Sequence, residues 1–411
     1  MHPVLAQQPI QRIVVFRALV LGDLLCATPA LRALKAAWPD AELTLIGLPW
    51  AQALAERLPQ VDRFEAFCGF PGLPERSPDL DALPNFLTRL RVRPADLLVQ
   101  LHGSGSVINP LLACFGARHV AGFVEPGEFC AEPALHGPWP RTGHEIERLL
   151  QLTDRLGLAR CGRHLDFPVQ ASDREALTHL LLQDNSNVPL ACVHVGAQLP
   201  SRRWLPERFA AVADQLVSMG LRVVLTGTPD EAELVRKVKG LMRADALDLS
   251  GRTTLWTLGA LIARAHLLVC NDTGVQHIAA ALGTPSVAIS SGAEVARWAP
   301  LDATRHRVLW AHAACRPCAH RECPTAHECA AGVSADQVVA AALSALQVPQ
   351  RARRAALDSQ SAAHSAGAAA ISVATATFGV STTPTATASA TATATASAAA
   401  DATASATVAS S

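Results

Sequence analysis

The sequence lacks a net charge, because its 35 Lys and Arg residues balance its 35 Asp and Glu residues. Binding to nucleic acid usually requires a basic surface, so this balance argues against a nucleic-acid partner. The chain also lacks any run of about 18 apolar residues, which argues against a transmembrane helix. We expect no secretory signal peptide, because Arg12 leads directly into a predicted strand.

Large apolar side chains are scarce in residues 351–411, which consist mostly of Ala, Thr and Ser. Such a segment has little to bury, so we expect a disordered low-complexity tail. The remaining part, about 350 residues long, is sufficient for two domains. The 11 cysteines lie mostly in apolar segments, which is typical of proteins kept in a reducing compartment.

Short apolar runs alternate with amphipathic helical patterns along most of the chain. This alternation is typical of parallel sheets covered by helices on both faces, and it predicts an α/β fold. The predicted strands are Arg12–Phe16, Leu43–Gly47, Asp96–Leu101, His119–Phe123, Ala191–Val195, Arg222–Thr226, Leu267–Cys270 and Ser286–Ser290, and predicted helices include Leu24–Ala37, Pro206–Met219 and Thr254–Ala263. Because the alternation pauses between residues 166 and 187, we predict one domain over residues 1–165 and a second over residues 166–350.

A polar turn follows the predicted strand that ends at Cys270, and a helix of small residues begins directly after it. The free N–H groups of such a turn and helix start attract anions. Asp272 and Thr273 add polar side chains there, and His277 lies about one helical turn further on. We interpret this turn as a pocket for a phosphorylated, hydroxyl-rich ligand. The alternative is a helix whose first turn is merely capped by Asp272 or Thr273.

Other strand ends carry further candidates. Asp23 follows the first strand, where a carboxylate can serve as a general base or as a helix N-cap. At the first strand of the second domain, Gly196 and Ala197 leave room for phosphate oxygens. Arg202 or Arg203 can stabilise a departing diphosphate, or both can belong to a solvated basic loop. Glu231 can bind a ribose, or it can be an ordinary acid in a first helical turn.

Three of these segments together resemble glycosyltransferase family 9, the ADP-heptose:lipopolysaccharide heptosyltransferases. They are Gly22-Asp23 with the following Ala-Thr-Pro-Ala-Leu-Arg (27–32), Arg-Arg-Trp-Leu-Pro-Glu-Arg-Phe (202–209), and the Asn-Asp-Thr-Gly…His turn (271–277). The resemblance covers roughly residues 12–346. It implies a GT-B fold, in which two Rossmann-like domains face each other across a cleft. The N-terminal domain would then bind the acceptor, and the C-terminal domain would bind the nucleotide sugar.

The same resemblance implies roles for individual residues. Asp23 matches the catalytic base, and Arg202 matches a phosphate-binding position that is usually lysine. Asp272 matches a carboxylate that binds heptose, with Thr273 and Gly274 at the diphosphate; Glu231 matches the ribose-binding acid less closely. The implied reaction is the inverting transfer of heptose from ADP-heptose to a lipopolysaccharide-core acceptor at the membrane surface, with no cofactor or catalytic metal. The implied location is the cytoplasm, including the inner face of the inner membrane.

Two other functions stay open on the sequence. One is a nucleotide-sugar epimerase on a GT-B-like fold, and the other is an inactive nucleotide-sugar-binding paralogue, which the change from lysine to Arg202 would favour. Four cysteines near the end of the predicted second domain are a separate question. Cys315, Cys318, Cys323 and Cys329 could hold a structural zinc, but their spacing is not that of a standard zinc finger, and we expect thiols that are free or opportunistically oxidised.

Overall fold

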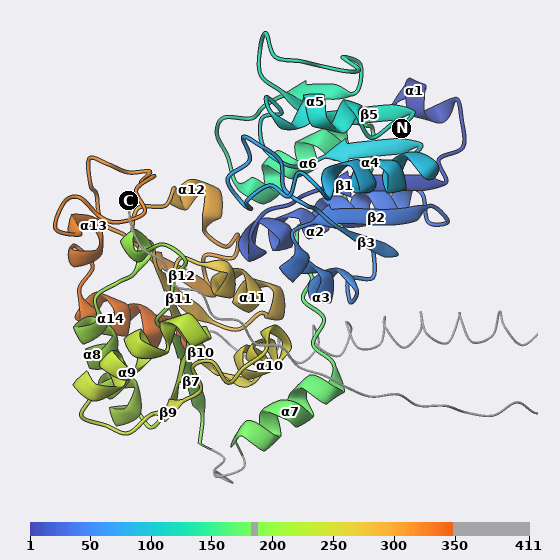
Figure 1. The fold of residues 1–411 in the computed structure, drawn as a ribbon. Coiled ribbons are helices and arrows are strands. Elements are labelled where there is room, and N and C mark those ends of the chain that lie inside the picture. Colours follow the sequence, from blue (N-terminus) through green and yellow to red (C-terminus); the bar gives the residue numbers. More distant parts are fainter. Residues whose placement is uncertain (182–187, 348–411) are drawn as a thin grey trace, which may run out of the picture. The chain divides into compact units, whose positions relative to one another are not determined.

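The structure is a computed structural model that describes residues 1–181 and 188–347. The predicted tail, residues 351–411, lies outside the described residues. Figure 1 shows two β-sheets with helices packed around them. We call residues 1–165, which contain the first sheet, the N-terminal half, and the rest of the described chain the C-terminal half. The boundary of the two domains stays a prediction.

Both sheets are parallel, six-stranded and identical in topology. The first has the order β3-β2-β1-β4-β5-β6 and the second the order β12-β11-β10-β7-β8-β9. Counted from its own first strand, each sheet therefore runs 3-2-1-4-5-6, which is the dinucleotide-binding order. The strands are β1 (Arg12–Phe16), β2 (Glu42–Gly47), β3 (Arg63–Ala66), β4 (Leu97–Gln100), β5 (His119–Val124), β6 (His136–Pro138), β7 (Leu190–His194), β8 (Arg222–Thr226), β9 (Leu247–Asp248), β10 (Leu267–Asn271), β11 (Ser286–Ile289) and β12 (His306–Leu309).

Helices connect most consecutive strands, whereas β5 and β6 are joined by a segment without a helix. The α-helices are α1 (Pro3–Ala6), α2 (Leu21–Ala37), α3 (Gln52–Ala55), α4 (Leu83–Val92), α5 (Ile108–Ala113), α6 (Glu145–Arg155), α7 (Ala171–Leu181), α8 (Pro206–Ser218), α9 (Ala232–Leu241), α10 (Leu255–Arg264), α11 (Gly274–Leu282), α12 (Val295–Trp298), α13 (Glu328–Ala331) and α14 (Ala335–Leu346). Short 3₁₀ turns are η1 (Pro49–Ala51), η2 (Pro200–Arg202) and η3 (Pro229–Glu231). No helix in the described part of the chain is both long and apolar enough to cross a membrane.

The predicted α/β fold is confirmed, and each predicted strand is present, either with the predicted ends or with ends shifted by one residue. The sequence reading missed β3, β6, β9 and β12. All four are the outer strands of their sheets. An outer strand is covered less completely than a central one, so it needs no continuous apolar run. Strand β3, for example, alternates charged with apolar residues and has no fully buried position.

The two halves meet where α2 packs against α11. Glycine makes this close approach possible at two positions. A Cβ on Gly22 would lie 2.7 Å from Cδ2 of His277, and a Cβ on Gly274 would lie 2.9 Å from Cβ of Leu21. Apolar residues of both helices belong to one buried cluster, so the core of the N-terminal half continues into the C-terminal half.

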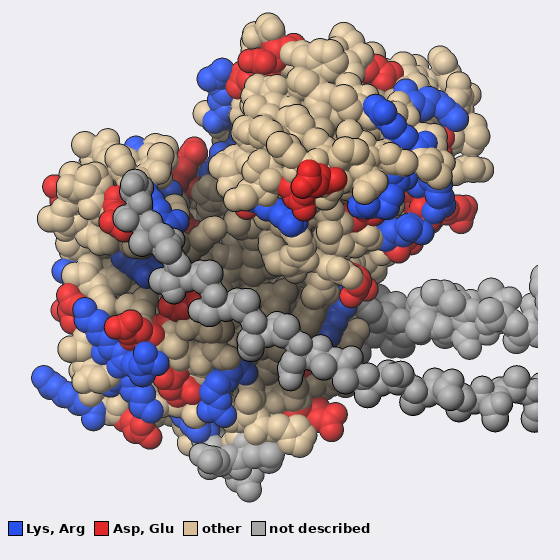
Figure 2. Space-filling view, in the orientation of Figure 1, with Lys and Arg blue, Asp and Glu red and all other residues tan. Residues whose placement is uncertain are grey.

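Charged side chains are unevenly distributed over the surface. Figure 2 shows Lys and Arg gathered over α8 and α9, whereas the visible face of the N-terminal half has a broad area without charged side chains.

Candidate active site

A cavity of about 760 Å³ lies at the carboxyl ends of the strands of both sheets. Parallel α/β sheets bind ligands at this edge, beside the point where the strand order reverses. Residues after β1 form the wall contributed by the N-terminal half, and residues after β7, β8, β10 and β11 form most of the opposite wall. The predicted site residues that line the cavity are Asp23, Ala197, Arg202, Glu231, Asp272, Thr273, Gly274 and His277.

Asp23 is the third residue of α2, so it lies within the first helical turn. The N-cap position belongs to Val20, which contradicts the alternative that Asp23 is the N-cap. Arg17, at the end of β1, approaches Asp23 with Nη2 3.3 Å from Oδ1. Burial raises the pKa of Asp23 to about 6, although the positive charge of Arg17 lowers it. A carboxylate with this pKa is ionised at neutral pH and still basic enough to accept a proton in a reaction.

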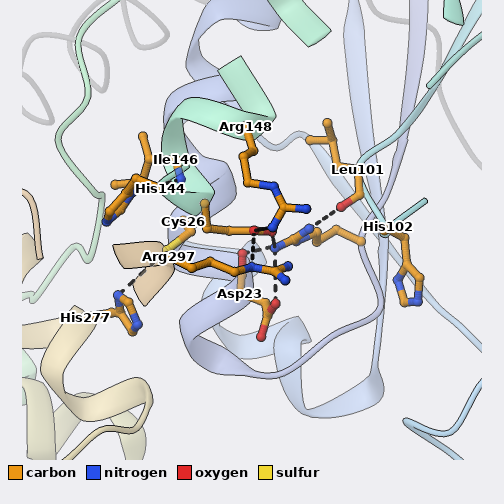
Figure 3. A network of polar contacts seen from close by, with 12 residues as sticks. Asp23, Cys26, Leu101, His102, His144, Ile146, Arg148, His277 and Arg297 are labelled. Atoms are coloured by element: carbon orange, nitrogen blue, oxygen red, sulfur yellow. Dashed lines mark hydrogen bonds and ion pairs between the residues drawn. The ribbon is translucent and has the colours of Figure 1, made fainter. Parts of the chain in front are cut away.

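A buried network of charges surrounds Asp23 (Figure 3). Glu145, at the start of α6, accepts hydrogen bonds from Arg17 (3.1 Å), Arg148 (3.1 Å) and Arg297 (2.9 Å). The first two arginines belong to the N-terminal half, but Arg297 lies on α12 in the C-terminal half. Although burial raises the pKa of Glu145, the three arginines hold it below its ordinary value.

Asp272 and Thr273 occupy the turn between β10 and α11. Asp272 accepts hydrogen bonds from the hydroxyl of Ser290 (3.0 Å) and from the amide of Gln276. Burial raises the pKa of Asp272. Thr273 is the N-cap residue of α11, but its side chain makes no capping bond. Its Oγ1 is buried and has no hydrogen-bond partner among the described residues, so a ligand in the cavity could use it.

Arg202 is half-buried and donates from Nη2 to the carbonyl of Cys318 at 2.6 Å. Its positive charge also lowers the pKa of Asp272, so the two side chains act on the same part of the cavity. Asn271 holds this segment in place: its side chain accepts from the Trp204 amide (2.8 Å) and donates to the Val195 carbonyl (2.8 Å). Arg202 therefore does not belong to a freely solvated loop.

Glu231 is an acid of a first helical turn, and its predicted role in ribose binding stays a prediction. It lines the cavity, and it also forms a capping box in which its Oε2 accepts from the Thr228 amide at 2.9 Å. The interpretation of Gly196 needs a correction. A Cβ at Gly196 would lie 2.0 Å from Oε2 of Glu231, so the missing side chain makes room for this carboxylate and not for phosphate. Its neighbour Ala197 does line the cavity.

His277 is 4% exposed and lies between the two halves. Its Nδ1 is 3.7 Å from Sγ of Cys26 on α2, and its ring packs edge-on against Trp298. Burial lowers the pKa of His277 to about 4, so the ring is neutral at neutral pH. His277 lines the cavity, but most of its surface packs against protein.

The segment that contains the four cysteines forms part of the cavity wall. Pro317 lines the cavity, and Cys318 contacts two of its loops through the carbonyl bound by Arg202 and an amide 2.7 Å from the Gly292 carbonyl. All four cysteines are free thiols. Across residues 1–181 and 188–347, no group of three or more His, Cys, Asp or Glu side chains is arranged to hold a metal ion.

Sequence reasoning missed the residues that surround the predicted ones. Arg17 directly follows an apolar strand, and Asn271 ends another. A polar residue at the end of an apolar strand is a signal that could have identified both. Glu145 and Arg297 gave none, because they lie 122 and 274 residues beyond Asp23 in sequence and meet near it only in the folded chain.

Comparison with known proteins agrees with this geometry. The sequence model of glycosyltransferase family 9 (heptosyltransferase) matches residues 86–328. Lipopolysaccharide heptosyltransferase 2 of Salmonella typhimurium is 27% identical over 285 residues, which cover 66% of this chain and 79% of the relative.

Two solved structures share the fold. The family 9 glycosyl transferase of Veillonella parvula is 22% identical, with a TM-score of 0.69 over 83% of this chain and 98% of that chain. The ADP-heptose lipopolysaccharide heptosyltransferase II of Escherichia coli is 20% identical, with a TM-score of 0.63 over 82% and 98%. The predicted family and GT-B fold are thus confirmed: the chain belongs to glycosyltransferase family 9 and is a glycosyltransferase.

Proposed function

We propose that this glycosyltransferase moves a heptose from ADP-heptose to a lipopolysaccharide-core acceptor, with inversion at the anomeric carbon. One observation carries the proposal: a carboxylate suited to proton transfer faces the same cavity as the guanidinium of Arg202 and the turn that begins α11. Asp23 stands on the N-terminal side, and Arg202 and Thr273 stand on the C-terminal side. The related enzymes named for heptose transfer support the choice of sugar and acceptor.

On the acceptor side, Asp23 takes the proton of the attacking hydroxyl. The hydroxyl oxygen then forms a bond to the anomeric carbon as the bond from that carbon to the donor diphosphate breaks. A base on one side and a leaving group on the other favour a single displacement, which inverts the anomeric centre. The pKa of Asp23, raised by burial to about 6, suits this role because the group is ionised yet basic at neutral pH.

On the donor side, the departing ADP carries the negative charge that develops during transfer. We assign its stabilisation to the guanidinium of Arg202, the hydroxyl of Thr273 and the free N–H groups at the start of α11. Asp272 would accept hydrogen bonds from hydroxyls of the heptose, and Glu231 would bind the ribose. These groups provide charge stabilisation through the chain's own side chains and backbone, and the proposal includes no cofactor and no catalytic metal.

The acceptor would reach the cavity over the N-terminal half. Large exposed apolar residues follow the carboxyl ends of five strands of its sheet, and they are Val20, Trp50, Leu80, Val107 and Phe129. Val20 also lines the cavity. We call these five residues the apolar entrance. Exposed apolar side chains at this position suit an acceptor that is attached to a lipid. This supports a reaction that takes place at the inner surface of the inner membrane. In this proposal the N-terminal half is the acceptor domain and the C-terminal half is the donor domain.

A transfer assay on the full chain tests the proposal. Purified protein is incubated with ADP-heptose, with and without lipopolysaccharide-core acceptors that differ in the number of heptoses they already carry, while ADP release and the products are measured. We expect ADP release that depends on the acceptor, and a glycosidic product of inverted anomeric configuration. An altered sugar nucleotide formed without acceptor would identify an epimerase. Donor binding without any turnover would identify an inactive paralogue.

The role of the apolar entrance has its own test. Replacing Trp50, Leu80 and Phe129 together by serine should weaken binding to phospholipid vesicles and slow transfer to acceptor embedded in them. Transfer to a deacylated, water-soluble acceptor should stay unchanged. Val92 is the matched control, because it is 74% exposed but lies at the far end of α4, away from the cavity edge. Equal loss in Val92→Ser would contradict a specific role for the entrance.

A further inference from the structure

The charge network around Asp23 includes a contact between the two halves that the proposed reaction does not explain. Glu145 begins α6 and is 1% exposed, yet it binds Arg297 from α12 of the other half. The adjacent residue, His144, makes a second contact of this kind, with Nε2 2.6 Å from the Ala299 carbonyl. Nδ1 of the same ring accepts from the Ile146 amide, so Nε2 carries the proton and donates. The start of α6 is therefore bound at two adjacent points, to α12 and to Ala299, the residue that follows it.

We propose that Arg297 and Glu145 are positioning residues for the base, which join the two halves and set the charge around the Asp23 carboxylate. This inference rests on the proposed role of Asp23 as the base. Arg297 also lines the cavity, so the helix that contributes its charge belongs to the donor side of the site. The base would then acquire its working charge environment only when the donor half is in contact with α6.

The sign of each effect follows from the arrangement of charges. Arg17 lies between the two carboxylates, 3.3 Å from Asp23 and 3.1 Å from Glu145. Counting Arg17, Arg148 and Arg297 against Asp23 and Glu145, the network carries three positive and two negative charges, a net charge of +1. Removing the charge of Arg297 lowers the net charge of the network to 0, which disfavours an ionised Asp23. Removing Glu145 leaves +2, which favours it.

Other ionisable groups near the base change this balance little. On α2 itself, the buried Cys26 keeps its proton, because burial raises the pKa of its thiol well above neutral pH. His277 from α11 and His102 after β4 are neutral, because burial lowers their pKa values to about 4 and about 3. Burial also lowers the pKa of His144 on α6. Glu294, which precedes α12, acts on Arg148 and so opposes part of the positive charge.

The pH dependence of kcat/KM tests the proposal, because a purely structural contact would not move it in a defined direction. The wild-type rate should fall as the pH drops through about 6, where Asp23 gains a proton. We call this fall in kcat/KM the acidic limb. In Arg297→Gln the acidic limb should move to higher pH by roughly half to one pH unit. The kcat at pH 8.5 should stay within about threefold of the wild-type value. Arg297→Lys should restore the limb. Glu145→Gln should move it down.

Arg141→Gln is the matched control, because Arg141 is a 77%-exposed arginine of the N-terminal half paired with Glu125 outside the cavity. It should leave the limb in place. Glu145→Gln leaves buried arginines without a counter-charge, so its melting temperature is measured first. If Glu145→Gln does not fold, the test rests on Arg297→Gln. The Arg297 side chain is 27% exposed, so we expect its replacement to leave the protein folded. An unmoved limb in Arg297→Gln, with equal loss at every pH, would overturn the proposal.

A further variant separates this failure from failure of the proposed function. If Asp23→Asn keeps its activity, the assignment of the base is wrong, and the inference that depends on it also fails. If Asp23→Asn loses activity while the limb stays fixed in Arg297→Gln, only the role of Arg297 and Glu145 fails.

Discussion

Asp23 and Asp272 are two carboxylates that follow strands beside the switch points of two sheets with the same topology. Burial raises the pKa of both. They differ in what touches them. Asp23 faces the guanidinium of Arg17, whereas Asp272 accepts hydrogen bonds from the neutral groups of Ser290 and Gln276. The same local structure can thus hold one carboxylate suited to proton transfer and another suited to binding hydroxyl groups.

The two halves differ in the same way on a larger scale. Near Asp23, the N-terminal half contributes a buried network in which each charge has a partner. The C-terminal half instead contributes the Thr273 hydroxyl, which has no hydrogen-bond partner within the described part of the chain, and the start of α11. Arg297 is the exception, because it belongs to the C-terminal half but completes the network of the N-terminal half. Arg297 thus links the buried network of the N-terminal half to the cavity wall of the C-terminal half.

Among the variants, Asp23→Asn should have the largest effect on kcat, and it should distinguish Asp23 most clearly from Asp272. Loss of a general base should lower kcat by roughly 10²–10⁴-fold. The fold should survive, because the raised folded-state pKa means that the ionised Asp23 carboxylate lowers the stability of the wild type at neutral pH. The variant should therefore melt no lower than wild type at pH 7.5, with any advantage lost by pH 4. Near-full kcat would mean that Asp23 has only a structural role.

Arg202→Ala should have the next largest effect, because it removes a positive charge from the leaving-group side. Loss of a charge-assisted hydrogen bond suggests about 1.5–3 kcal/mol, or roughly a 10- to 150-fold loss in kcat/KM. Arg202→Lys should recover much of the activity, since lysine keeps the charge. Unchanged kinetics in Arg202→Ala would transfer this role to Arg203, which also lines the cavity.

Asp272→Asn should cost less than either change and so sharpen the comparison with Asp23. An asparagine can still pair with the Ser290 hydroxyl and the Gln276 amide, so the turn should keep its geometry. We expect a loss of about 3- to 10-fold, mostly in KM, from a weaker hydrogen bond to the sugar. Steady-state kinetics on both variants measure the difference. A loss in kcat as large as that of Asp23→Asn would mean that the two carboxylates share the chemistry.

Brief chelation with EDTA should have the smallest effect, because charge stabilisation is assigned to Arg202 and backbone N–H groups. The chelation experiment distinguishes an Asp272 that binds sugar hydroxyls from an Asp272 that binds a divalent cation. kcat is measured after brief chelation and the melting temperature after long chelation. Prompt loss of activity at unchanged melting temperature, reversed by Mg²⁺ or Mn²⁺, would contradict the assignment. Slow loss that follows a falling melting temperature would indicate a structural zinc near the four cysteines.

The sequence predicted the central strands well, because a strand covered on both faces must be apolar along its length. Strand β10, for example, is buried at every position. The outer strands escaped prediction for the opposite reason, as the charged residues of β3 illustrate. In the candidate site, polar residues directly after apolar strands were a usable signal. That signal found Asp23 and Asp272 but gave the wrong reason for Gly196, whose missing side chain accommodates a residue 35 positions away in sequence, Glu231.

The sequence by itself determined the α/β architecture, the family and the places where chemistry is expected, because strand periodicity and strand-end motifs are local in the chain. The tertiary structure alone decided the environment of those places. It brought Glu145 and Arg297 together near Asp23, and it left the Thr273 hydroxyl without a hydrogen-bond partner among residues 1–181 and 188–347. Burial and neighbouring charge set the strength of a base, and both depend on segments that meet only after the chain has folded.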